Sequence, residues 1–101
     1  MFTRFEQFGR MEDLEEAITY YRQRLHLCPI VDLNRPSSLN NLAAAMYACF
    51  EQLDRMGDLE EAITCYRQAV ALFRHGHLNR PTSLDNLAHA VYTRFKRLGR
   101  T

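Results

Sequence analysis

The sequence predicts an all-α protein built from antiparallel helix hairpins that repeat along the chain. The first observation is an internal repeat, because the chain aligned with itself at an offset of 45 residues gives about 31 identities in 56 pairs. The second is that apolar residues in each copy recur at three- and four-residue steps, as in an amphipathic helix. The third is that no segment alternates apolar and polar residues between turn residues. We expect an α-solenoid of about five helices.

Length and composition favour a single domain of the soluble globular class. The chain has 101 residues, of which 47% are hydrophobic and 25% charged, and its net charge is +1. This balance argues against nucleic acid and membrane surfaces as partners, since both attract a large basic face. No apolar run is long enough to span a membrane, and the N-terminus lacks the apolar core of a signal peptide. We expect an intracellular, cytoplasmic protein.

The repeat divides the chain into a partial unit at residues 1–11 and two units at 12–56 and 57–101. Each unit contributes a helix that we name A and a helix that we name B. In chain order, the expected helices are A, B, A, B and A.

The A helices are expected at residues 1 to about 9, 37–54 and 82–98, each with its apolar residues on one side. Each full A helix follows the phrase Asn-Arg-Pro-Ser or Asn-Arg-Pro-Thr. Proline should end the incoming loop, and Ser37 or Thr82 should cap the first turn.

The B helices are expected at residues 13–28 and 58–74. Acidic residues lie in the first turn of each, where they match the helix dipole. Asp58 and Glu61 have the spacing of a capping pair at the start of the second B helix.

Short polar turns at residues 9–12 and 54–57 connect each A helix to the B helix that follows it. A connection of this length joins antiparallel neighbours, so A and B should form a hairpin. Ala17 and Ala62 are expected where the two helices of a hairpin approach most closely.

The stretch GDLEEAI at residues 57–63, followed by Tyr66 and Ala69, closely resembles the second helix of the tetratricopeptide repeat. Residues 41–43 are similar to the start of the first helix of that repeat. The resemblance covers essentially the whole chain, although this unit is longer than the usual repeat of about 34 residues. The near-identical copies look like the long arrays of fungal proteins, some of which carry a CHAT-type or nucleotide-binding domain.

The resemblance implies stacked hairpins in a right-handed superhelix, with A helices lining a concave groove that binds a peptide or a partner helix. An asparagine amide offers both a donor and an acceptor to a peptide backbone, which favours Asn41 and its repeat counterpart Asn86. Capping or solvation of the helix start is an alternative role for both. The predicted groove residues are Asn41, Gln52, Arg55, Asn86, His89, Lys96 and Arg97.

We find no motif for catalysis, a cofactor or a metal. The cysteines Cys28, Cys49 and Cys65 are far apart and form no CxxC pair, so free thiols are expected. His75 and His77 lie in a loop without further ligands at zinc-site spacing. The chain also lacks a nucleophile elbow, a phosphate-binding loop and an HExxH motif. We expect a protein that is not an enzyme.

The repeat also predicts self-association, most simply as a homodimer. The last A helix has no B helix after it, and the first B helix lacks the opening turns of its A partner, so both ends are uncapped. Self-association is expected through Leu84, Leu87, Val91, Phe95 and Leu98. The function is therefore either a scaffold that binds a protein or peptide in its groove, or a purely structural, self-assembling repeat without a separate ligand.

Overall fold

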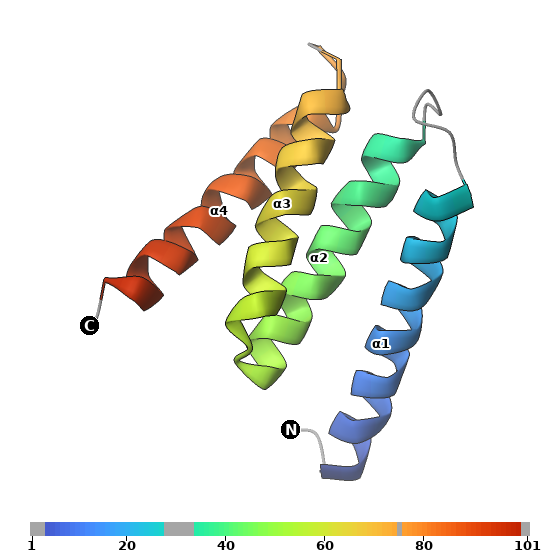
Figure 1. Ribbon diagram of the computed structural model, residues 1–101, viewed down its shortest axis with the longest axis vertical. Helices are drawn as coiled ribbons and strands as arrows, with labels where there is room; N and C mark the ends of the chain where they lie inside the picture. Colours follow the sequence, from blue (N-terminus) through green and yellow to red (C-terminus); the bar gives the residue numbers. More distant parts are fainter. Residues whose placement is uncertain (1–3, 28–33, 75, 100–101) are drawn as a thin grey trace.

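Four α-helices make up the fold, seen in a computed structural model that describes residues 4–27, 34–74 and 76–99, with side chains from Arg10 onward. The helices are α1 (Arg4–Leu27), α2 (Arg35–Leu53), α3 (Met56–Leu72) and α4 (Arg80–Leu98). No strand occurs within these ranges, which confirms the all-α class. Each helix packs against the next one in the chain, and α2 also contacts α4 (Figure 1). The hairpin of α2 and α3 thus lies between α1 and α4.

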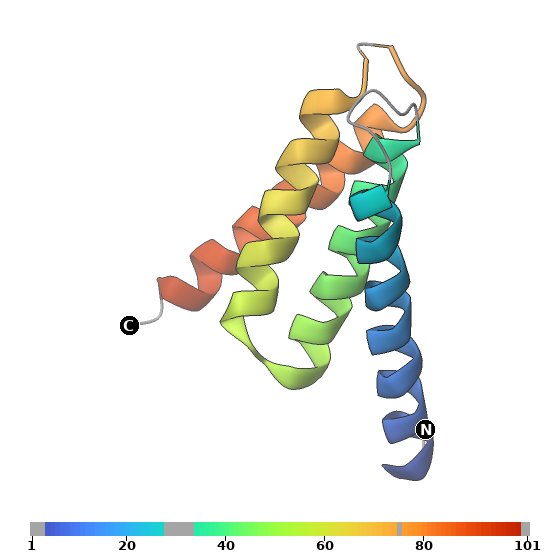
Figure 2. The ribbon, with the colours of Figure 1, turned by 45° about the vertical axis from the view of Figure 1, so that its right-hand side comes forward.

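The core lies mainly between α2 and α3, the antiparallel pair joined by the short turn at the bottom of Figure 2. Small residues stand where the helices meet: Ala43, Ala62 and Ala90 are completely buried. The larger buried residues around them are Leu42, Met46 and Phe50 of α2 and Leu59, Ile63 and Tyr66 of α3. The apolar sides predicted for the central A and B helices are therefore the core.

The expected turn at residues 9–12 does not form, because α1 is continuous from Arg4 to Leu27. This joins the predicted partial A helix to the first B helix and gives four described helices instead of five. In the second copy the turn does form, and Asp54 there has a left-handed backbone with φ of 56°. A continuous helix keeps its backbone hydrogen bonds through Gly9, and a glycine inside a helix costs only about 1 kcal/mol.

Helices α2 and α4 begin at Arg35 and Arg80, two residues before the starts expected at Ser37 and Thr82. Proline therefore belongs to the first helical turn, where its missing N–H and fixed φ are tolerated. Neither helix has a side-chain hydrogen bond at its N-cap, so the capping role expected of Ser37 and Thr82 is wrong.

Helix α3 also starts early, at Met56, and lacks the expected capping pair. The Asp58 carboxylate instead accepts a hydrogen bond from Arg55 Nε at 2.9 Å. Glu61 accepts one from Arg22 of α1 at 2.8 Å. These acids stabilise the turn and the contact between neighbouring helices in place of the helix start.

Ala62 and Ala17 differ although they occupy the same repeat position. Ala62 has no exposed surface, as expected of a close helix contact, whereas Ala17 is only half-buried. The difference arises because α2 covers Ala62 while no described A helix occupies the equivalent place beside Ala17.

We predict that Ala62→Leu lowers the melting temperature much more than Ala71→Leu, because Ala71 lies on the exposed side of α3. Overpacking a filled contact costs about 1–3 kcal/mol, and each kcal/mol corresponds to roughly 4–8 °C in a domain of this size. Thermal melts followed by circular dichroism measure both variants. Equal effects would show that the assigned face of α3 is wrong.

We also predict a specific loss of stability at high pH. Burial, with a smaller contribution from Tyr47, raises the pKa of Tyr66 from 10.0 to about 12. The unfolded chain therefore releases this proton at lower pH than the folded one, so the stabilising contribution is complete below pH 10 and is lost as the pH rises toward 12. Melting temperatures of the protein and of Tyr66→Phe should change in parallel up to pH 10. Above it, the protein with Tyr66 should lose stability faster, and parallel curves throughout would contradict the prediction.

Candidate binding surfaces

A polar pocket of about 320 Å³ lies between the N-terminal ends of α2 and α4 and contains the predicted groove residue Asn41. Its lining consists of Ser37, Asn40, Asn41, Phe73, Asn79 and Thr82. Amide and hydroxyl groups supply both donors and acceptors on these walls, and Phe73 adds an apolar surface. The pocket can therefore hold a polar backbone together with one small side chain.

Three contacts between α2 and α4 fix the surface beside this pocket. Ser83 Oγ donates to Asn40 Oδ1 at 2.8 Å, and the Tyr47 and Thr93 hydroxyls share a hydrogen bond of 2.9 Å. The ring of His89, a predicted groove residue, lies 5.5 Å from the ring of Tyr47. The sequence analysis did not identify Tyr47 as a site residue. The available signal was that the equivalent position one repeat later, on the same side of the helix, is also a tyrosine.

The other predicted groove residues do not gather around the pocket. Gln52 is exposed and Asn86 is half-buried. Lys96 lies over the Tyr92 ring, 4.9 Å from its centre. Arg97 is already engaged near the end of α4, where it pairs with Asp54 at 2.6 Å and lies 5.1 Å from the centre of the Phe50 ring.

Arg55 is separated from the groove altogether. It precedes α3, pairs with Asp58, and lines a different cavity that α1 also borders. The seven predicted residues thus do not form one continuous site: Asn41 lines the pocket, His89 lies beside Tyr47, and Arg97 contacts the other end of α2.

An apolar face of α4 is open to solvent although its sequence repeats the buried face of α2. Phe50 is 2% exposed and its counterpart Phe95 is 68% exposed, while Leu39 and Leu84 are 3% and 40% exposed. A shallow cavity of about 410 Å³ on this face is lined by Val91, Arg94, Phe95, Leu98 and Gly99. The difference arises because α3 covers α2 and no described helix covers the same side of α4.

The predicted self-association residues fall on this face to different degrees. Leu84, Phe95 and Leu98 are exposed. Leu87 and Val91 are partly buried against the core, because that edge of α4 turns toward α3.

The two described thiols, Cys49 and Cys65, are free and buried. Burial is the main reason why the pKa of each is raised, so both stay protonated and weakly nucleophilic. His77 has a local role, since its Nδ1 accepts a hydrogen bond from the Asn79 backbone N–H at 3.0 Å. Cys28 and His75 lie outside the described residues.

Within the part of the chain that the structure describes, no three His, Cys, Asp or Glu side chains are grouped as metal ligands. The same residues contain no helix that is long and apolar enough to cross a membrane.

Antiparallel helices that pack in chain order and repeat the same apolar face define a helical-repeat protein of the α-solenoid class. Residues 53–75, which include the turn after α2 and all of α3, match the family model of the tetratricopeptide repeat. This stretch is thus similar to the tetratricopeptide repeat, as the GDLEEAI pattern predicted. Comparisons with curated proteins and with solved structures gave no match.

Proposed function

We propose that the protein is a non-catalytic scaffold that binds an extended peptide, or the end of a partner helix, across the N-terminal ends of α2 and α4. The tetratricopeptide repeat indicates an interaction module with protein partners. The observation that carries the finer proposal is the pocket around Asn41, with its two further asparagines and its two hydroxyl groups.

The chemistry of this pocket suits a peptide backbone better than an apolar ligand. Asn41 is exposed, so its amide is available to a backbone N–H and C=O at once. A volume of about 320 Å³ lies at the small end of ligand pockets, which suits one side chain inserted from a peptide. His89 and Tyr47 extend the surface along the helices and offer ring faces to the following residues.

The first test is a peptide-array screen of the purified chain, followed by titration of a selected peptide with variants. Asn41→Ala should weaken binding by roughly tenfold, because it removes hydrogen bonds from a desolvated contact. Asn86→Ala is the matched variant at the same repeat position, and it should weaken binding less because Asn86 is outside the pocket.

Arg67→Ala and Gln68→Ala, on the exposed side of α3, are the controls and should leave binding unchanged. All four variants should keep the circular-dichroism melt of the parent chain. A ligand that is lost with Arg67→Ala or Gln68→Ala but retained with Asn41→Ala would contradict the proposed site.

Self-association is a second candidate function, and the exposed apolar face of α4 favours it. The occupant we propose is α1 of a second copy. Four apolar residues of α1, each identical to its counterpart in the core face of α3, are only half-buried: Leu14, Ala17, Ile18 and Tyr21. Helix α4 of one copy against α1 of another would therefore repeat the packing of α2 against α3.

We predict that light scattering after gel filtration gives a mass of at least twice 11.9 kDa at micromolar concentration. Leu84→Glu combined with Phe95→Glu should give a folded monomer, because both side chains are exposed and a buried charge is costly at an apolar contact. Tyr92→Glu is the control, since Tyr92 is also exposed on α4 but lies outside the predicted contact residues. A parent chain that stays monomeric would rule out this candidate.

A further inference from the structure

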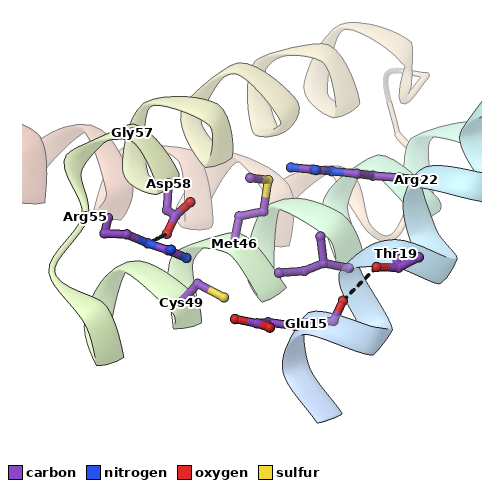
Figure 3. Close-up of a pocket in the computed structure, with 9 residues that line it drawn as sticks. Glu15, Thr19, Arg22, Met46, Cys49, Arg55, Gly57 and Asp58 are labelled. Atoms are coloured by element: carbon purple, nitrogen blue, oxygen red, sulfur yellow. Dashed lines mark hydrogen bonds and ion pairs between the residues drawn. The ribbon is translucent and has the colours of Figure 1, made fainter. Parts of the chain in front are cut away.

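A cavity of about 430 Å³ lies where α1 and α2 meet the start of α3. Glu15 and Arg22 of α1, Cys49 of α2, and Arg55 and Asp58 beside the turn contribute to its walls (Figure 3). It shares no residue with the pocket around Asn41. The cavity therefore belongs to a surface that the proposed peptide site does not use.

At the equivalent place one repeat later, an ion pair joins α3 and α4. Arg94 of α4 donates from Nη1 to Glu60 Oε1 of α3 at 3.0 Å. Forty-five residues earlier, Glu15 corresponds to Glu60 and Cys49 corresponds to Arg94. A cysteine side chain is several atoms shorter than an arginine side chain and carries no charge at neutral pH. The cavity between α1 and α2 thus lies at the repeat position where the contact between α3 and α4 holds a guanidinium group.

The arginines that line the cavity pair with acids other than Glu15. Arg22 pairs with Glu61 at 2.8 Å, and Arg55 pairs with Asp58 at 2.9 Å. Within the described residues, no side chain forms a hydrogen bond or an ion pair with the Glu15 carboxylate. Figure 3 shows this carboxylate next to the thiol of Cys49, the residue that corresponds to Arg94 in the repeat.

We propose that this cavity binds an alkylguanidinium group, with the Glu15 carboxylate pairing to the guanidinium in place of the missing arginine. A guanidinium group donates two parallel hydrogen bonds to a carboxylate, which an ammonium group does not. Ile18, Met46 and Cys49 line the cavity and contact the alkyl part. The ligand is either an arginine side chain of a partner peptide or a small guanidinium compound.

The test is a titration of the full chain with ethylguanidinium, followed by NMR of the backbone amides. Signals of cavity residues such as Thr19, Cys49 and Gly57 should shift and saturate. Binding should be weak, with a dissociation constant of roughly tens of mM or more, because an exposed ion pair contributes only about 0–1 kcal/mol. Ethylammonium and sodium chloride at the same ionic strength are the controls, and equal shifts with either would overturn the proposal.

The repeat supplies a matched pair of variants. Glu15→Gln should weaken ethylguanidinium binding by roughly tenfold or more, because the charged acceptor is removed. Glu60→Gln makes the same change at the same repeat position, but between α3 and α4, where Arg94 already pairs with the glutamate. This variant should leave binding unchanged. Binding that survives Glu15→Gln, or that is lost equally in both variants, would overturn the proposal.

A second pair of variants tests whether binding needs the empty space of the cavity. Cys49→Arg should abolish binding and raise the melting temperature by forming the ion pair with Glu15, whereas Cys49→Ser should bind like the parent chain. If Cys49→Arg does not fold, the two glutamate variants still decide the question. A peptide Gly-Arg-Gly with blocked ends distinguishes the two sources, because tighter binding than ethylguanidinium indicates a partner protein and equal binding indicates a small compound.

Discussion

Helices α2 and α3 approach each other closely, and this contact positions the other two helices. Ala43 and Ala62 are buried completely at this contact, and the larger side chains of both helices fill the space around them. Small residues at the closest point let long apolar neighbours interdigitate at the density of a protein interior. Helices α1 and α4 then pack on either side of this pair, so their positions follow from it.

Much of the fold could be predicted from the sequence, because the apolar pattern that marks each helix and its buried face occurs in more than one copy of the repeat. What failed depended on context that one copy does not share with another. Residues 9–12 repeat the turn sequence at 54–57 only in part: Gly9 stands where the second copy has Asp54, the residue with the left-handed backbone, and the helix continues through them. A turn that forms in one copy therefore does not predict the same turn in another.

The candidate site was predicted less well because its contacts join residues that differ between the copies. Thr93 bonds to Tyr47 where the preceding copy has Ala48, and Arg97 bonds to Asp54 where the other copies have Gly9 and Gly99. A comparison of the copies identifies the residues that are identical in each, and most of these lie in the core. The differences lie at the joints between units, where they give nearly identical helices distinct surfaces and, at Cys49, a cavity in place of an ion pair.

The contact proposed above joins α4 of one copy to α1 of another, and the use of two unlike faces has a consequence for assembly. Such a contact has a direction, so two copies joined by it once would still present one free face of each kind. Assembly would then either close into a ring with a fixed number of copies or grow as an open filament with two distinct ends. The rotation between successive units decides between these outcomes, and in an open filament the average length rises with protein concentration.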